Sequence, residues 1–240
     1  PNNDQGWLMR AQIAADDPVA FAKDPFGTYT IDDLLKFTAM LSPSDSVGTQ
    51  HMYSNLGLAL LGYVLEQATD ESFEKQMKDL LAELNMPTTL LFNQAMDTSR
   101  LANAYNMAND PMPWMRFRAM APAGGIVSNL RDLSRYVELM LRKGKSPELT
   151  QQIRTSTKPR FTIDEERKVK IGTTWYSQYA PNKYAESGRT LVIWHDGRTT
   201  GQFAQLMIVP DEEIAIVVLC NKYILTKNFS NSILIEILKY

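Results

Sequence analysis

Residues 51–65 read His-Met-Tyr-Ser-Asn-Leu-Gly-Leu-Ala-Leu-Leu-Gly-Tyr-Val-Leu, a polar triplet followed at once by an almost unbroken apolar run. Ser54 and Asn55 are suited to cap a helix, because their side-chain oxygens accept hydrogen bonds from the free amides of a first turn. Leucine and valine then cover most faces of the helix that follows, which is the pattern of a buried helix. The stretch therefore predicts a phenol and a carboxamide, two residues apart, held at the start of a core helix.

The hydrophobic period changes from helical to strand near residue 170, and this change predicts the fold class. Capping residues and apolar stripes predict four earlier helices, which begin after Thr30, Ser54, Ser72 and Ser128. Strand patterns and a last helix follow, at residues 172–179, 189–195, 201–209, 214–220 and 230–240. Short connections between the strands make the sheet antiparallel. We expect an α/β protein of the α+β type, with a mostly helical region at residues 1–165 and an antiparallel sheet flanked by helices at residues 166–240.

Composition excludes several classes of function. The 240 residues carry a net charge of −2 without a basic block, which argues against a nucleic-acid partner. The longest apolar stretch, residues 56–65, is far shorter than the roughly 20 residues of a membrane span. Cys220, the single cysteine, lies in an apolar strand as a small core residue, so cysteine usage leaves the compartment open. With only two histidines, and no acidic or cysteine partner pattern around His51, a metal site has little support, and we expect no metal and no cofactor.

Two small polar motifs, far apart in the sequence, stand at the edges of predicted elements. The first is Tyr53-Ser54-Asn55, and the second is His195-Asp-Gly197 at the end of a strand. Between them lies Gly124-Gly-Ile-Val-Ser-Asn-Leu-Arg-Asp-Leu133. In this order the motifs resemble the penicillin-recognising serine hydrolases, namely class C β-lactamases, DD-peptidases and related esterases. That superfamily carries Ser-x-x-Lys, then Tyr-x-Asn, then Lys/His-x-Gly on a strand at the sheet edge.

The resemblance implies a role for each matching residue. A serine nucleophile needs a base, and a free tyrosine with a pKa of about 10 becomes one only where nearby cations favour the phenolate. Tyr53 is therefore the expected base or proton relay, and Asn55 would bind the family's lysine and the substrate carbonyl. His195 would be a pH-sensitive cation or donor where many relatives have lysine. Gly197 would let the substrate lie along the strand, and the backbone N–H of Arg198 would form half of the oxyanion hole.

The sequence departs from the family pattern at the nucleophile. No Ser-x-x-Lys precedes Tyr53, and Ser72-Phe-Glu-Lys75 is explained better as a helix cap. Since the chain begins at Pro1 without an initiator methionine or signal peptide, we expect a fragment whose N-terminal portion is missing. That portion would be supplied upstream in the same chain or as a separate chain. It would bring strands and a central helix of the same core, so one edge and one face of the sheet would lack cover, and the fragment alone would be inactive.

The resemblance leaves two functions open. The first is a serine hydrolase that acts through an acyl-enzyme on a peptide, ester or lactam carbonyl. The alternative is a non-catalytic penicillin-binding-like protein that binds a ligand or partner through the same cleft. The expected partner in either case is a small-molecule or peptide substrate or ligand. Family members are often exported, so the resemblance implies a periplasmic or secreted protein.

Overall fold

The computed structural model describes residues 26–42, 48–92, 98–141, 146–182, 186–222 and 229–238. They form two compact units. The first contains the described residues up to Leu101 together with Trp114–Ser128, and the second contains Ala102–Pro113 and the described residues from Asn129 onward. The predicted division into residues 1–165 and 166–240 stays a prediction. The two compact units have other bounds because helices α7 (Leu130–Met140) and α8 (Pro147–Thr157), which precede residue 165, pack with each other and α7 packs on the sheet.

The first unit is mostly helical, and its helices begin where capping residues stand. Thr30 forms a reciprocal capping box with Asp33, Ser54 caps the next helix, and Ser72 caps the third. The elements of this unit are α3 (Ile31–Ala39), α4 (Asn55–Thr69), α5 (Phe73–Glu83), β1 (Leu90–Leu91), η1 (Thr98–Arg100), α6 (Ala121–Gly124) and β4 (Ile126–Val127). Its buried core gathers around Tyr29, Phe37 and Met120. The three predicted helix starts in this unit are confirmed.

Helix α4 is buried on one face only, so the prediction of a helix buried all round is wrong. Leu56, Ala59 and Gly62 are its buried residues. A β-carbon at Gly62 would lie 2.2 Å from Cγ of Pro122, so glycine is what lets α6 pack directly on α4. The opposite side exposes an apolar stripe, with Leu61, Val64 and Leu65 at 50%, 50% and 38% exposure. Hydrophobicity predicted the helix correctly, but the number of neighbours around it decides how many faces are covered.

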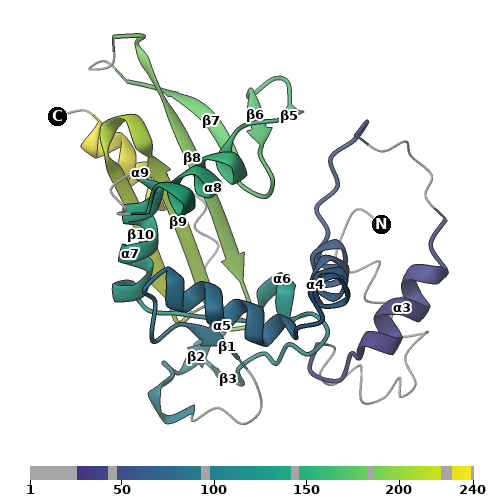
Figure 1. The fold of residues 1–240 in the computed structure, drawn as a ribbon. Coiled ribbons are helices and arrows are strands. Elements are labelled where there is room, and N and C mark those ends of the chain that lie inside the picture. Colours follow the sequence, from purple (N-terminus) through teal and green to yellow (C-terminus); the bar gives the residue numbers. More distant parts are fainter. Residues whose placement is uncertain are drawn as a thin grey trace. The chain divides into compact units, whose positions relative to one another are not determined.

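The second unit is built on a six-stranded antiparallel sheet in the order β10-β9-β8-β7-β6-β5 (Figure 1). Its strands are β5 (Phe161–Asp164), β6 (Val169–Ile171), β7 (Tyr176–Pro181), β8 (Arg189–Arg198), β9 (Phe203–Val209) and β10 (Ile214–Cys220). The other elements are β2 (Ala104–Tyr105), β3 (Pro111–Met112), α7 (Leu130–Met140), α8 (Pro147–Thr157), η2 (Pro210–Glu212) and α9 (Phe229–Ile237). The antiparallel sheet with its flanking helices confirms the predicted fold class.

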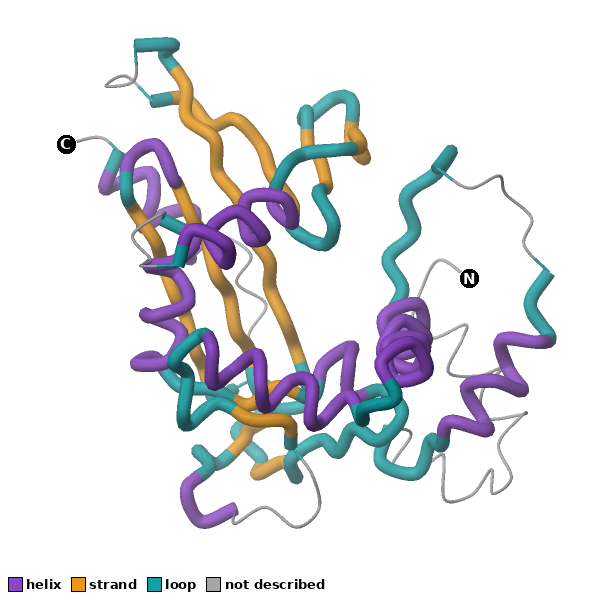
Figure 2. Tube along the Cα trace, viewed as in Figure 1, coloured by secondary structure: helices purple, strands orange, loops and turns teal. Residues whose placement is uncertain are grey.

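Alternate residues of β9 face two different helices, as the period of a strand requires. Met207 and Val209 pack with Leu234 of α9, whereas Ile208 packs with Val137 and Met140 of α7. Figure 2 shows these helices beside the sheet strands. Both faces of β9 are thus covered, by α9 and by α7, so the prediction of a bare sheet face is wrong at this strand. β10 and β5 end the strand order of the described sheet, and the expected uncovered edge stays a prediction.

Three details of the second unit differ from the sequence prediction. Asn129, one residue after Ser128, caps α7, and the Ser128 hydroxyl instead shares a hydrogen bond of 2.7 Å with Thr89. Helix α8 and the β5–β6 hairpin were not predicted, because their segments are short and polar. Of the predicted last helix, residues 230–237 are confirmed as part of α9, whereas residues 239–240 lie outside the described residues.

A buried hydrogen bond ties α9 to the sheet and gives a test of this fold. The Ser230 hydroxyl donates to Oε1 of Gln205 at 2.5 Å, and both side chains are buried. Ser230→Ala leaves that oxygen without a donor, so we expect a loss of about 1–3 kcal/mol in the free energy of unfolding, measured in urea. Ser134→Ala, which removes an exposed hydroxyl bonded within its own helix, is the matched control and should stay within about 0.5 kcal/mol. Equal losses in the two variants would contradict this account.

Candidate active site

The Tyr-Ser-Asn triplet forms a small polar group at the start of α4. Ser54 has an extended backbone, and its hydroxyl accepts a hydrogen bond of 2.9 Å from the amide of Gly57. Because Ser54 takes the capping position, Asn55 keeps its carboxamide for another partner. The Tyr53 hydroxyl donates to Oδ1 of Asn55 at 3.1 Å, and Tyr53 is 48% exposed. The phenol and the carboxamide are thus joined at the surface of the first unit.

The His-Asp-Gly motif lies inside β8, which runs on to Arg198 rather than ending at His195. Pairing with β9 continues along the whole motif, from His195 opposite Leu206 to Arg198 opposite Phe203. Pairing with β7 stops earlier, where Tyr176 lies opposite Trp194. Within the described sheet, residues 195–198 therefore have a strand on one side only. Their other edge offers backbone groups to which an extended ligand could add as a strand.

Gly197 keeps this free edge flat. A β-carbon built on it would meet no described atom within 4 Å, so packing inside the chain does not explain the glycine. Next to it, a guanidinium nitrogen of Arg198 lies 3.4 Å from a carboxylate oxygen of Asp196, and the guanidinium lies 5.5 Å from the ring centre of Phe203. The Arg198 side chain is thus occupied beside the strand, which leaves its backbone as the part available to a ligand.

Two aromatic residues that the sequence analysis did not single out surround His195. The ring of Tyr176 stacks on the imidazole with 5.5 Å between ring centres, and Trp175 meets it edge-on at 6.2 Å. Burial, and to a lesser degree the carboxylate of Asp196, raise the pKa of Tyr176, so its phenol stays neutral well above neutral pH. Trp175 directly precedes β7 and Tyr176 is its first residue, and β7 pairs with the strand of His195. The sequence placed both residues in the predicted strand 172–179 but did not show which strand lies beside it.

The structure therefore brings the predicted site residues together in two groups. Tyr53 and Asn55 form one group in the first unit, and His195, Gly197 and Arg198 form the other along β8 in the second. That these two groups face one active site stays a prediction.

The single Ser-x-x-Lys of the sequence behaves as a helix cap. The Ser72 hydroxyl accepts a hydrogen bond of 3.2 Å from the amide of Lys75 at the start of α5. The Lys75 ammonium is bound by Glu71 and Asp79 at 2.8 and 2.9 Å on the exposed side of the helix. These side-chain hydrogen bonds raise the pKa of Lys75 to about 12. A lysine held protonated in this way is a poor candidate to activate Ser72.

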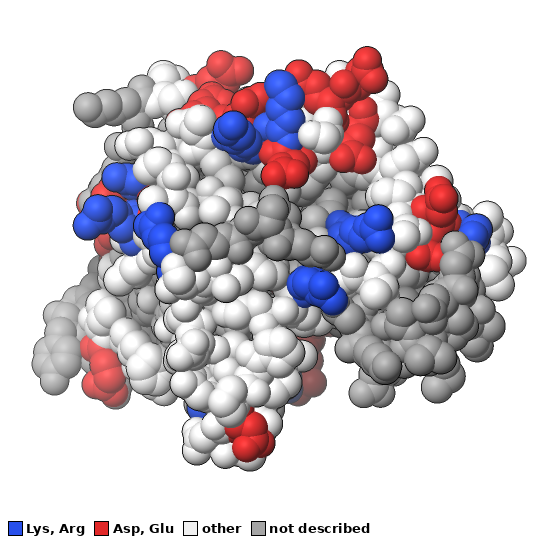
Figure 3. Space-filling view, turned by 90° about the horizontal axis from the view of Figure 1, so that it is seen from below, with Lys and Arg blue, Asp and Glu red and all other residues white. Residues whose placement is uncertain are grey.

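Other kinds of site find little support in the described part of the chain. Its His, Cys, Asp and Glu residues form no group of three or more that could hold a metal ion. None of its helices is both long enough and apolar enough to cross a membrane. On the face shown in Figure 3, lysine and arginine side chains stand apart from one another or beside acidic ones. That face carries no continuous basic surface of the kind that binds nucleic acid.

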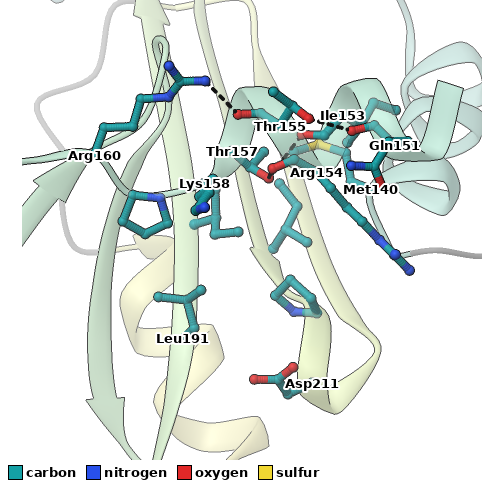
Figure 4. A pocket seen from close by; sticks show the side chains of 14 residues that line it. Met140, Gln151, Ile153, Arg154, Thr155, Thr157, Lys158, Arg160, Leu191 and Asp211 are labelled. Atoms are coloured by element: carbon teal, nitrogen blue, oxygen red, sulfur yellow. Dashed lines mark hydrogen bonds between the residues drawn. The ribbon is translucent and has the colours of Figure 1, made fainter. Parts of the chain in front are cut away.

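The second unit also contains a recess of about 690 Å³ that none of the predicted site residues line. Leu191, Ile193 and Ile208 of the sheet and residues of α8 form its walls. Figure 4 shows that the side chains of Arg154 and Arg160 extend to opposite sides of it, and Arg160 donates to a backbone carbonyl 3.4 Å away. The guanidinium groups of Arg154 and Arg160 therefore do not converge on one ligand in this recess.

Comparison with known proteins places this geometry in context. The sequence profile of the family described as beta-lactamase matches residues 7–234. A beta-lactamase of Providencia stuartii is 25% identical over 224 residues, covering 83% of this chain and 58% of that protein. Penicillin-binding protein 4 of Amycolatopsis lactamdurans is 23% identical over 193 residues, covering 75% and 49%. The chain thus spans about half the length of these two curated relatives.

Solved structures support the same fold. A class C beta lactamase from Rhodobacter sphaeroides superposes with a TM-score of 0.74 at 19% identity, covering 88% of this chain and 66% of that one. A D-alanine carboxypeptidase from Burkholderia cenocepacia superposes with a TM-score of 0.71 at 19% identity, covering 94% and 68%. At this level of identity the two structures speak for the fold alone.

The aromatic residues beneath His195 generate a prediction about alkaline stability. Tyr136 of α7 stacks on Trp175 with 6.4 Å between ring centres, and burial raises the pKa of Tyr136 to about 12. An unfolded tyrosine ionises at about 10, so the folded state holds this proton more tightly. That contribution to stability is present below about pH 10 and is lost as the pH rises toward about 12. The free energy of unfolding, measured in urea, should therefore fall more steeply over this pH range in the wild type than in Tyr136→Phe. Parallel pH profiles would contradict the assignment.

Proposed function

The chain belongs to the beta-lactamase family, and on that premise we propose that it supplies the larger part of a serine hydrolase that works through an acyl-enzyme. The single observation that carries this proposal is the hydrogen bond between the Tyr53 hydroxyl and the Asn55 carboxamide at the start of α4. A phenol is useful to a serine nucleophile only if it is held in place and can exchange a proton. The capped helix start provides the first condition, and the exposure of Tyr53 allows the second.

In the proposed reaction, Tyr53 as phenolate takes the proton of a serine hydroxyl while the serine oxygen attacks the substrate carbonyl carbon. The tetrahedral intermediate collapses when its leaving group accepts a proton, and water then releases the acyl group from the serine. We place the serine in a Ser-x-x-Lys outside the given sequence, because none precedes Tyr53. The lysine of that motif would favour the phenolate, and Asn55 would bind the lysine and the substrate carbonyl.

The second half of the proposed site is the free edge of β8. A substrate would lie along residues 195–198 as an additional strand, with its carbonyl oxygen accepting a hydrogen bond from the Arg198 amide. His195 would act there as a donor or, when protonated, as a cation. The absence of a β7 partner at these residues, within the described sheet, supports this role.

The substrate class is a carbonyl compound of the lactam, ester or D-amino-acid peptide type. The names of the two curated relatives, a beta-lactamase and a penicillin-binding protein, are consistent with β-lactam or peptide carbonyls. How fast the acyl group leaves decides among these activities, and differences of about an ångström in geometry are enough to change that rate. We further propose a periplasmic or secreted location, as is usual in this family.

Covalent labelling tests the proposed reaction. The full-length protein, incubated with a fluorescent β-lactam or an alkyl phosphonate, should acquire one label, detected on a denaturing gel and by intact mass. Tyr53→Phe should slow labelling by about 10²-fold or more, because it removes the base. Tyr63→Phe, which changes a tyrosine within α4, should label at the wild-type rate, and the 240-residue chain alone should stay unlabelled.

A folded full-length protein that takes up neither probe would overturn the hydrolase proposal. It would favour the second candidate, a non-catalytic relative that binds a ligand through the same residues. Reading the residues upstream of Pro1 separates the two candidates, because a Ser-x-x-Lys there favours the hydrolase and its absence favours the binding protein. Noncovalent binding of a peptide or β-lactam, followed by calorimetry, would then be expected, and it would weaken in Tyr53→Phe.

The free edge of β8 can be tested separately at Gly197. A valine there has room for its β-carbon and suits a strand, so stability should change by no more than about 0.5 kcal/mol. If a substrate lies along this edge, the branched side chain displaces it, and kcat/KM should fall by about tenfold or more. Gly197→Ala should give a smaller loss in the same direction. An unchanged kcat/KM in Gly197→Val would remove the substrate from this edge.

A further inference from the structure

We propose that Trp175 is a positioning residue that fixes the imidazole of His195 at the free edge of β8. The inference rests on the proposed function, because it assigns a task to the residue that orients a member of that site. It goes beyond the three family motifs, since Trp175 belongs to none of them. Three sets of contacts among the described residues support this role of Trp175.

Two aromatic rings contact the imidazole of His195. Trp175 meets the imidazole edge-on, with an angle of 85° between the ring planes, while Tyr176 lies nearly parallel to it at 25°. An imidazole on a strand rotates about two side-chain torsions unless neighbours restrict it. One edge contact and one stacked contact, from two successive residues, restrict both torsions. The ring nitrogens of His195 are thereby aimed by neighbours that carry no formal charge at neutral pH.

Trp175 is itself held in place by residues of α7. Its indole stacks on Tyr136 and packs against the buried cluster of Val137, Met140 and Ile208. Tyr136 comes from α7 and Ile208 from β9, so a helix and a strand of the second unit both hold the indole. A side chain locked by packing can in turn orient a neighbour, which is what a functional side chain needs from its support.

The backbone of Trp175 is fixed by a turn that is hydrogen-bonded to the end of α8. The amide of Gly172 donates to the carbonyl of Trp175 at 2.8 Å, and the amide of Thr173 donates to the carbonyl of Ser156 at 3.0 Å. A β-carbon at Gly172 would lie 2.7 Å from the Ser156 carbonyl oxygen, so the turn presses directly on the helix end. Backbone and side chain of Trp175 are thus fixed independently, by α8 and by α7.

The competing explanation is that Trp175 only fills the core and touches His195 by coincidence of register. Core filling predicts a loss of stability when the indole is removed, and no particular effect on the imidazole. Positioning predicts that the imidazole loses its fixed orientation even in a variant that stays folded. The two explanations are therefore separated by observing His195 itself.

The imidazole of His195 can be observed directly by NMR, because the chain contains only two histidines, His51 and His195. In proton–carbon NMR spectra of the imidazole groups, Trp175→Leu should shift and broaden the His195 signals and leave those of His51 in place. Trp175→Phe, which keeps an aromatic edge, should restore sharp signals. Leu234→Ala loosens the other core cluster of the sheet, to which Trp175 does not belong, and as the matched control it should leave both histidines unchanged.

The catalytic consequence is measured in the full-length protein. Trp175→Leu should lower kcat by about tenfold or more, the scale expected when a group that acts on the reacting atoms is misplaced, with KM changed much less. Trp175→Phe should recover most of the loss, and Leu234→Ala should keep the wild-type kcat. A purely structural role would instead lower the two core variants together, in proportion to their loss of stability.

The two measurements distinguish failure of this proposal from failure of the proposed function. If His195 responds as expected in the NMR spectra and no variant shows turnover, the positioning contact stands and the hydrolase assignment falls. If the His195 signals are unaffected by Trp175→Leu, or respond equally to Leu234→Ala, then Trp175 is a core residue and the proposal is overturned, whatever the activity.

Discussion

The unequal pairing of β8 is the constraint on which the rest of this structure depends. Residues 189–194 pair with β7 and residues 193–198 pair with β9, so only Ile193 and Trp194 have strands on both sides. Residues 195–198 have β9 on one side and, within the described sheet, no strand on the other. Backbone hydrogen-bonding groups are strong and seek partners, so an unpaired strand edge is a standing site for an added strand. The same ten-residue strand therefore anchors the core at one end and presents polar groups at the other.

Capping chemistry made much of the helical part predictable from the sequence. Thr30, Ser54 and Ser72 each begin a helix where their side chains predicted one, because a cap is a local interaction within about four residues. Local capping does not fix the start of α7, because Ser128 and Asn129 are both good caps. The hydrogen bond between Ser128 and Thr89 leaves Asn129 as the cap. The exposed stripe of α4 shows a second limit, because hydrophobicity does not reveal how many neighbours a helix has.

The candidate site divides in the same way between local and distant interactions. Tyr53, Asn55, His195 and Gly197 belong to short motifs, so their residue types and spacing were enough to single them out. Trp175 belongs to no motif, and its contact with His195 depends on the register between β7 and β8, on the turn against α8 and on the packing of α7. Such contacts exist only once several elements have assembled, which is why sequence reasoning overlooked a neighbour that touches a predicted site residue.

The single cysteine of the chain acquires a practical value from the strand register. Cys220 is a free, partly buried thiol on β10, opposite Phe203, which in turn lies opposite Arg198. Two strand spacings separate the backbones of Cys220 and Arg198, a distance of about 10 Å. A thiol-reactive fluorophore would attach to the natural sequence at this one position, in the same cross-strand row as the β8 edge. The protein thus carries a built-in optical reporter position for following ligands as they arrive and leave.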